Sequence, residues 1–467
     1  MKRKLFFFSL IFTTLLTAGF GCNPSFTNQK AQEAMQPITL NYWRVYDGSD
    51  DFKDIIANYQ KIHPFVKINY RELTYDEYQN ALLNAFAEDK GPDIFSIHNT
   101  WVRKYKDLIK PLPETITMAY PVTQGTLKKV VVPVLKTTKS LLPQDVANNF
   151  VDAVYGDVVI PDSKTQKNLI YGLPLSIDTL VMYYNKDLFN NAGIAQPPAY
   201  WNDEFQQDVK KLTEQDTKGQ IVQSGVSLGG TTNVERPEDV LSVLMMQDGA
   251  QMMDNTGAVV FDNIPNGFQE QNSSPGADAL RFYTDFANPA KEVYSWNSTL
   301  DPSLQMFTEG KLAMTFGYSY DLPTIRSEAP KLNFGIANLP QIENNPQVNF
   351  ANYWVETVSS KSQHANEAWD FVQFETSAEQ AKLYLGKAKK PTALRSLIDW
   401  QSSDPDLGPF VSEVLTAKSW YHGNDPDAAD KIMNDMIDQV NSGQGKIEDI
   451  LRLSAMKVQQ TVNESNY

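Results

Sequence analysis

The sequence predicts an α/β fold divided between two domains, and three observations carry this prediction. Segments with strand periodicity and segments with helix periodicity alternate from residue 38 onward, which is typical of a sheet covered by helices. The chain has 467 residues, more than one ordinary hydrophobic core accommodates. Hydrophobic residues make up 42% of it and charged residues 21%, as in soluble globular proteins.

The first elements of the folded part follow one another as strand, helix, strand, helix, strand. Strands are expected at 38–42, 66–70 and 93–98. The first helix has an apolar face and stops before Pro64, and the second begins with a capping box of Thr74 and Glu77. Strands joined through helices pair in parallel, so this unit is expected to form one parallel sheet.

Aromatic and polar side chains are dense where the first and third of these strands end. Ligands of parallel sheets bind beyond the carboxyl ends of the strands, so both clusters are candidates for a binding site. A purely structural role for Trp43 and Trp101, closing the top of the core, is the alternative. The candidates are Trp43, Tyr46 and Asp47 after the first strand and His98, Asn99 and Trp101 after the third.

The segment 111–168 is rich in proline and is expected to consist of helices and loops that decorate the first domain. After Pro111, its prolines are Pro113, Pro121, Pro133, Pro143 and Pro161.

The N-terminal residues have the layout of a secretory signal, predicted to span residues 1–21. Residues 2–4 are Lys, Arg and Lys, and an apolar run follows over 5–20. This run is somewhat short for a membrane-spanning helix, which needs about 20 residues.

Cys22, the one cysteine of the chain, follows Gly21 directly. This arrangement resembles a bacterial lipoprotein signal, which implies that Cys22 carries lipid after processing. Gly19 differs from the aliphatic residue usual three positions before the cysteine, and a plain secretory signal with an incidental cysteine is the alternative. The polar residues after Cys22, up to residue 37, are expected to form a flexible tether between membrane and domain.

The segment 172–205 has a distinctive order of elements. It reads GLPLSIDTLVMYYNKDLFNNAGIAQPPAYWNDEF, a buried strand followed by a helix that Asn185 caps and Gly193 ends. It resembles the extracellular solute-binding proteins of bacterial ABC importers, in particular the group that carries sugars and oligosaccharides. Segments 92–100, 252–263, 307–322 and 367–377 resemble the same family in the same order.

The resemblance implies a two-lobed fold like that of periplasmic binding proteins, each lobe a mainly parallel sheet flanked by helices, with hinge crossovers. Lobe 1 is then expected over 38–176 and 313–352. Lobe 2 is expected over 177–312 and 353–467. Several crossings between lobes suit closure by a hinge.

The resemblance also extends the candidate site. Rings of Trp and Tyr stack on the apolar face of a sugar, while carboxylates and amides bind its hydroxyl groups. In place of the glycine-rich turn common in the family, the chain has Ala351, Asn352, Tyr353 and Trp354. The residues added in this way are Ser176, Asp178, Tyr318, Tyr320, Tyr353 and Trp354.

The implied function is capture of a small solute outside the cytoplasm, expected to be a mono- or oligosaccharide, and its delivery to the permease subunits of an ABC transporter. The protein is expected to be a monomer and to reach the membrane through lipid on Cys22. No enzymatic activity, cofactor or metal is expected, since the four histidines have no metal-ligand spacing. A net charge of -15 disfavours nucleic acid as a partner.

Other functions fit parts of the pattern. A surface-anchored glycan-binding or sensor protein without transport has the same anchor and cleft. A secreted glycoside hydrolase needs only two suitably placed carboxylates among many acidic residues. A peptide, polyamine or phosphodiester ligand needs a matching charge cluster, for which Arg44, Arg326 and Arg395 are the candidates.

Overall fold

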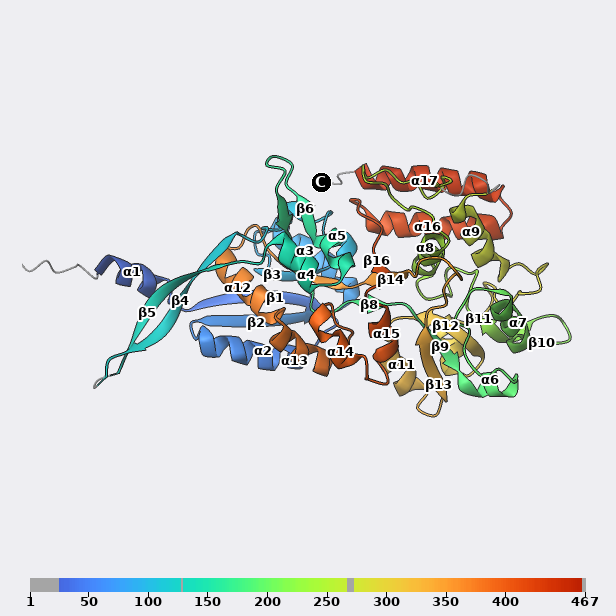
Figure 1. Ribbon diagram of the computed structural model, residues 1–467, viewed down its shortest axis with the longest axis horizontal. Coiled ribbons are helices and arrows are strands. Elements are labelled where there is room, and N and C mark those ends of the chain that lie inside the picture. The colour runs from blue at the N-terminus through green and yellow to red at the C-terminus, as the bar shows by residue number, and fades with distance from the viewer. Residues whose placement is uncertain (1–24, 127–128, 267–272, 464–467) are drawn as a thin grey trace, which may run out of the picture.

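The computed structural model describes residues 25–126, 129–266 and 273–463. The chain forms two lobes side by side along the long axis, with a pair of strands and helix α1 (Ser25–Glu33) reaching out from the end of lobe 1 (Figure 1). The expected signal 1–21 and Cys22 lie outside the described residues. No helix within the described ranges is both long and apolar enough to cross a bilayer.

The sheet of lobe 1 has the strand order β15-β3-β1-β2. β1 pairs in parallel with β2 and β3, and this confirms the alternating strands and helices expected from the sequence. β15 is antiparallel to β3, with Trp354 opposite His98. The elements are β1 (Ile38–Val45), α2 (Ser49–Ile62), β2 (Val66–Leu73), α3 (Tyr75–Ala87), β3 (Ile94–His98), β15 (Trp354–Val358), α12 (Ala365–Glu375) and α13 (Ala378–Ala388).

Strands occur in the segment 111–168 where helices and loops were expected. β4 (Thr115–Gln124) and β5 (Val130–Lys139) form a long antiparallel hairpin. Pro121 lies opposite Pro133 in this hairpin. Each strand of a two-stranded ribbon has one edge without a partner strand, and a proline whose nitrogen faces that edge removes no hydrogen bond of the ladder. The segment continues with α4 (Pro143–Asn149), α5 (Asp152–Val158), β6 (Val159–Pro161) and β7 (Asn168–Ile170).

Helix α1 occupies part of the segment expected to be a flexible tether. It packs against β5, and its Ala31 side chain is buried. The prediction of a flexible tether therefore needs correction over residues 25–33, because packing against another element stabilises a short helix beyond its own propensity.

The sheet of lobe 2 has the order β10-β11-β12-β9-β13 and mixed orientation. Only the pairing of β11 with β12 is parallel, so a mainly parallel sheet describes lobe 1 and not lobe 2. The strands are β9 (Val181–Asn185), β10 (Glu214–Gln215), β11 (Ile221–Val226), β12 (Leu312–Gly317) and β13 (Phe334–Asn338).

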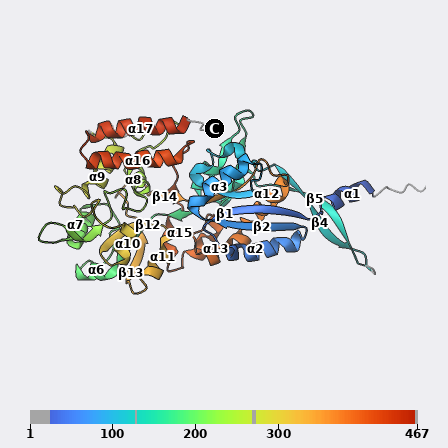
Figure 2. The ribbon, with the colours of Figure 1, turned by 180° about the vertical axis from the view of Figure 1, so that it is seen from behind.

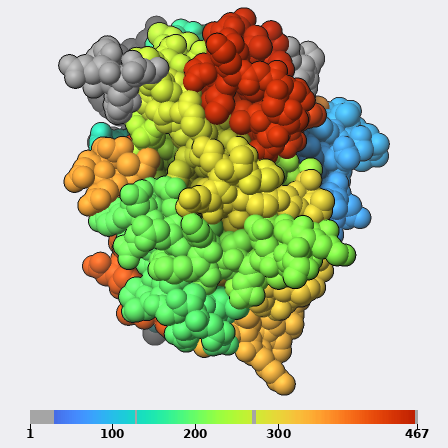
Figure 3. Space-filling view, turned by 90° about the vertical axis from the view of Figure 1, so that its right-hand side faces the viewer, coloured from blue at the N-terminus to red at the C-terminus, as the bar shows by residue number. Residues whose placement is uncertain are grey.

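Helices cover the lobe 2 sheet on both sides, and the C-terminal helices form its outer layer (Figures 1 and 2). Figure 3 looks onto the far end of lobe 2, where these helices, in red, lie beside the green and yellow segments of the same lobe. The helices are α6 (Lys186–Asn191), α7 (Asp203–Leu212), α8 (Pro237–Gln247), α9 (Pro275–Asp285), α10 (Ser303–Thr308), α11 (Asp321–Glu328), α16 (Pro426–Asn441) and α17 (Ile447–Asn463).

A small three-stranded sheet joins the lobes. Its order is β16 (Ala417–Lys418), β14 (Asn349–Asn352) and β8 (Asp178–Thr179). The side chains before and after each strand belong to different hydrophobic cores, as Ile177 and Leu180 do on either side of β8. The chain therefore crosses between the lobes at each of these strands. The connection from α13 to β16 contains α14 (Ile398–Gln401) and α15 (Gly408–Glu413) and touches both lobes.

The lobe boundaries differ from the prediction in two segments. Residues 313–352 were expected in lobe 1, but β12 and β13 pair with β9 in lobe 2. Residues 353–397 were expected in lobe 2, but β15, α12 and α13 pack in the core of lobe 1. The pattern of a strand shows that it is buried and not which sheet it joins, so the assignment of these segments was wrong.

Candidate ligand-binding site

An aromatic cluster lies on lobe 1 at the carboxyl ends of its parallel strands. The indole of Trp354, the first residue of β15, is its centre. Three of its members, Tyr46, His98 and Trp101, follow or end β1 and β3, as the sequence predicted. The ring-centroid distances from Trp354 are 5.6 Å to Trp101, 5.9 Å to His98, 6.0 Å to Tyr78, 6.1 Å to Tyr46 and 6.3 Å to Tyr75.

The cluster has a buried base and an exposed surface. Trp101 and Tyr78 are buried, whereas the side chains of Tyr46 and Tyr75 are 59% and 46% exposed. The rings of Tyr46 and Tyr75 are nearly parallel, with centroids 6.0 Å apart and 8° between their planes. Tyr75 was not predicted. It begins α3 just beyond the carboxyl end of β2, so the rule that ligands bind beyond the carboxyl ends of parallel strands applies to it as well.

The backbone under this surface is strained. Tyr46 has φ of 70°, in the left-handed region that a residue with a Cβ rarely adopts. The neighbouring Asp47 holds the turn: its N–H donates to the Val45 carbonyl at 2.9 Å, and its own carbonyl accepts from the Tyr70 hydroxyl at 2.5 Å. The surrounding contacts thus fix the conformation that presents the Tyr46 ring.

Asp47 was expected to face a ligand. In the structure it lies beneath the site and supports it. Its buried carboxylate accepts hydrogen bonds from Arg44, from the Tyr384 hydroxyl at 3.0 Å and from Lys390 Nζ at 2.6 Å. Burial alone raises the pKa of Asp47, but the charges of Arg44 and Lys390 outweigh it and hold that pKa below its usual value.

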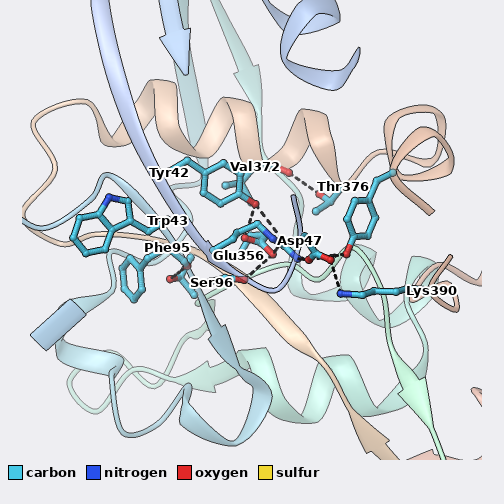
Figure 4. A network of polar contacts seen from close by, with 12 residues as sticks. Tyr42, Trp43, Asp47, Phe95, Ser96, Glu356, Val372, Thr376 and Lys390 are labelled. Atoms are coloured by element: carbon cyan, nitrogen blue, oxygen red, sulfur yellow. Dashed lines mark hydrogen bonds and ion pairs between the residues drawn. The ribbon is translucent and has the colours of Figure 1, made fainter. Parts of the chain in front are cut away.

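Glu356 completes this buried network, as Figure 4 shows. It is an ion-pair partner of Arg44, and it accepts from the Tyr42 hydroxyl at 2.6 Å and from Ser96 Oγ at 3.0 Å. Glu356 was missed by the sequence reasoning, although a glutamate inside the apolar strand 354–358 is itself a signal of a buried partner.

Trp43 does not join the cluster around Trp354. Its ring lies under the guanidinium of Arg71, 4.5 Å from the centroid, and it packs against the lobe 1 core. The structure therefore matches the alternative considered for this residue, a structural role.

His98 and Asn99 lie at the edge of the cluster next to the hinge. His98 Nε2 is 3.1 Å from Asn352 Oδ1, and burial together with the charge of Arg236 lowers the pKa of His98 to about 4. Its imidazole is therefore neutral at pH 7. The amide of Asn99 donates to Asp157 at 3.0 Å and to Ser419 at 3.1 Å. The buried Tyr353 also donates to Asp157, at 2.6 Å.

Asp178 of the hinge contacts Ser319 of lobe 2. Asp178 accepts hydrogen bonds from Ser319 N at 2.9 Å and from Ser319 Oγ at 2.6 Å. Burial raises the pKa of Asp178 to about 7, which these hydrogen bonds oppose. Ser176 bridges to Thr392 beside the hinge.

Two further tyrosines of lobe 2 form a stacked pair. The rings of Tyr318 and Tyr320 have centroids 5.5 Å apart. Tyr318 is buried and donates to Asp239 at 2.7 Å, whereas Tyr320 is 49% exposed. Tyr320 thus offers lobe 2 an exposed ring, as Tyr46 and Tyr75 do for lobe 1.

The charge of Arg236 acts on exposed rings of both lobes. Burial raises the pKa of Tyr46 to about 12, and the charge of Arg236 in lobe 2 opposes this effect across the lobe boundary. The charge of Arg236 likewise opposes the rise that burial causes in the pKa of Tyr320. Nothing in the sequence pattern pointed to Arg236, which has a left-handed φ of 45° directly before α8.

The three arginines that the sequence suggested lie elsewhere. Arg44 is buried in the network under Tyr46, Arg326 pairs with Asp406 and Arg395 pairs with Asp152.

Curated relatives resemble the chain over most of its length. The galactooligosaccharide-binding protein of Bacillus subtilis (strain 168) is 23% identical over 409 residues, which cover 87% of this chain and 83% of the relative. The sn-glycerol-3-phosphate-binding periplasmic protein of Shigella flexneri serotype 5b (strain 8401) is 26% identical over 376 residues, covering 74% of this chain and 72% of the relative.

Solved structures share the two-lobed fold, which confirms the predicted fold class. The cyclic α-maltosyl-1,6-maltose binding protein from Arthrobacter globiformis superposes with a TM-score of 0.70 at 18% identity, covering 91% of this chain and 99% of that chain. The family pattern of bacterial extracellular solute-binding proteins matches residues 47–382. This match covers more than half of the chain, so the protein belongs to the bacterial extracellular solute-binding proteins, a family of extracytoplasmic binding proteins.

Proposed function

We propose that this protein captures a mono- or oligosaccharide between its lobes and delivers it to the permease of an ABC importer. One observation carries the proposal: the exposed, parallel rings of Tyr46 and Tyr75 rest on a buried aromatic base. Flat aromatic faces suit the apolar C–H face of a sugar ring. The name of the Bacillus subtilis relative, a galactooligosaccharide-binding protein, supports this choice of ligand.

The charges beside these rings favour a neutral ligand over an anionic one. Arg236 is held by three carboxylates, with Glu238 at 2.9 Å, Asp239 at 2.8 Å and Asp430 at 3.4 Å. Its positive charge is therefore compensated within the protein and does not need an anion from outside. A sugar phosphate has to compete with these carboxylates for Arg236, whereas a neutral sugar does not.

Closure of the lobes is the proposed response to the ligand. The exposed rings belong to both lobes, with Tyr46 and Tyr75 on one and Tyr320 on the other. A ligand held by both sets favours the closed arrangement in proportion to its difference in affinity for closed and open forms. The hinge strands β8, β14 and β16 are the segments that bend.

The proposal is of a binding protein without enzymatic activity, anchored through lipid on Cys22. Acid–base hydrolysis of a glycoside needs two available carboxyl groups. Asp47 and Asp178, the carboxylates predicted for this site, each accept several hydrogen bonds from the protein itself. Mass spectrometry of the protein purified from membranes tests the lipid on Cys22.

Removal of the exposed rings tests the proposed ligand site. We expect Tyr46→Ala and Tyr75→Ala each to weaken sugar binding about tenfold, because each removes a stacking surface. Isothermal titration against a panel of mono- and oligosaccharides, with sn-glycerol 3-phosphate as the anionic comparison, measures this. Tyr200→Ala, which removes a ring that is 43% exposed on lobe 2, is the matched control and leaves binding unchanged. Binding of the anionic compound alone contradicts the sugar assignment.

A further inference from the structure

The β4–β5 hairpin reaches away from lobe 1 at the end opposite lobe 2, as both ribbon views show (Figures 1 and 2). Helix α1 lies along β5, so the described chain begins at this same end of the molecule. Between Cys22 and the start of α1 at Ser25 stand Asn23 and Pro24. Two connecting residues span about 10 Å between the flanking ones at most. Lipid on Cys22 therefore brings this end of the molecule to the bilayer.

The outer half of the hairpin exposes apolar side chains on both of its faces. The pairing register places Tyr120 opposite Val134 and Ala119 opposite Leu135, so Val122, Val130 and Val134 lie on one face and Val131 and Leu135 on the other. Exposed fractions range from 38% for Val122 to 61% for Val131. A contiguous group of this kind marks an interaction surface, whereas single exposed apolar residues do not.

The charge of the hairpin is opposite to that of the whole chain. Lys129, Lys136 and Lys139 belong to the described part of the hairpin, and its two strands contain no Asp or Glu. The chain as a whole has a net charge of -15. A local excess of lysine beside apolar side chains suits the interface of an anionic bilayer, where acyl chains take the apolar groups and headgroups pair with the ammonium groups.

We infer that the β4–β5 hairpin lies against an anionic phospholipid surface beside the N-terminal attachment point. The two-sided exposure favours lipid over a protein partner, because a protein surface covers one face of a ribbon while lipid surrounds its outer half. The inference uses the proposed lipid on Cys22 for its geometry, but binding by the hairpin itself is measurable without that lipid. It does not depend on which ligand the aromatic site takes.

Vesicle co-sedimentation tests the inference with the unlipidated chain from Asn23, which contains every element that the structure describes. The vesicles are pure phosphatidylcholine and a mixture of phosphatidylcholine with phosphatidylglycerol. We expect saturable binding to the anionic vesicles that weakens with added salt, and little binding to the neutral ones.

Two double variants of the hairpin separate its apolar and charged parts. Val130→Asp with Val131→Asp, and Lys129→Glu with Lys136→Glu, are each expected to weaken binding to anionic vesicles at least tenfold. The matched controls lie on lobe 2: Val222→Asp, at a valine that is 51% exposed, and Lys218→Glu with Lys446→Glu, at two exposed lysines. The controls are expected to bind like the parent protein. All of these positions are on the surface, and thermal unfolding checks that each variant folds.

Three outcomes overturn the inference. In the first, the parent chain fails to bind any vesicle. In the second, the hairpin variants and the control variants lose binding equally. In the third, vesicle binding is absent and the hairpin variants lose transport or self-association, which assigns the surface to a protein partner. Titration of the sugar on the same hairpin variants distinguishes this failure from failure of the proposed function, because the aromatic site is untouched in them.

Discussion

Tyr46 shows how a single residue of the candidate site is held in place. Its ring is exposed, its backbone is left-handed, and the next residue is fixed by Arg44, Tyr384 and Lys390. A strained conformation persists only when the surrounding contacts determine it. The buried ion pairs under Tyr46 thus stabilise a ring orientation that the residue does not prefer by itself.

The backbone strain at Tyr46 can be separated from the function of its ring. Tyr46→Gly and Tyr46→Ala both remove the ring, and both are expected to weaken sugar binding. Only glycine adopts a φ of 70° without cost, so the glycine variant is expected to be more stable than the alanine variant by about 1 kcal/mol. Urea unfolding of the two variants measures the difference. Equal stability contradicts the presence of strain at this position.

The raised pKa of Asp178 predicts a particular dependence of stability on pH. Its pKa is about 7 in the folded protein, because burial disfavours the charge, and about 4 when unfolded. The folded state therefore binds more protons between these values, and the contribution of Asp178 to stability is present below pH 4 and lost as the pH rises through 7. Asp178→Asn removes the titrating carboxyl group and with it this pH-dependent contribution to stability.

Unfolding of wild type and Asp178→Asn at a series of pH values measures the effect. The free energy of unfolding of wild type is expected to fall, relative to the variant, from pH 4 to pH 7. A constant difference between the two proteins over this range contradicts the raised pKa.

Some site residues could be predicted and others could not, for physical reasons. The ends of parallel strands share one edge, so strand order alone brought Tyr46, His98 and Trp101 to the same place. The side-chain partner of a carboxylate is not visible in sequence, which is why Asp47 was expected to face a ligand. Arg236 and Glu356 were missed because their roles depend on contacts between segments far apart in the chain.

At the scale of elements, two strands of lobe 2 and the hairpin of lobe 1 show two limits of sequence patterns. The apolar run of β12 indicates a buried strand, but the pairing of β12 and β13 with β9 is set by the register of a sheet made of distant segments. Proline in β4 and β5 obscured the hairpin, because proline disfavours strands within a sheet and not at free edges. The strands and helices of 38–98 were predictable because they follow each other directly and pair locally.

An ion pair between Lys104 and Asp427 joins elements of different lobes. Lys104 Nζ of lobe 1 lies 3.1 Å from Asp427 Oδ2 in the first turn of α16 in lobe 2. This contact requires the two lobes to lie close together, so it favours closure. Asp427→Asn is then expected to weaken sugar binding about twofold to fivefold, the effect of a partly exposed pair.

Asp435→Asn is the control for this prediction, since Asp435 pairs with Lys431 within α16. Titration calorimetry measures affinity, and small-angle X-ray scattering of the free proteins measures the radius of gyration. The Asp427 variant is expected to be more expanded than the control. Identical affinities and dimensions of the two variants count against a role of this pair in closure.

At the scale of the whole molecule, the three crossings between the lobes divide the chain into two cores that are each built from distant segments. The lobe 1 core joins residues 40–177 to residues 351–417, and the lobe 2 core joins 180–350 to 420–458. Neither core is complete until the second set of segments has been made. Each lobe therefore depends on long-range contacts, which slow folding.

With the proposed lipid on Cys22, the docking of α1 on the hairpin would also limit how far the protein moves from the bilayer. A free tether over 22–37 has a root-mean-square reach of about 22 Å, while Cys22 to Pro24 alone, ahead of α1, reach about 10 Å. A shorter connection confines the molecule to a thinner layer above the membrane. It also raises the effective concentration of the protein at a transporter in the same bilayer. A membrane transporter would then meet its loaded carrier mainly by diffusion in two dimensions.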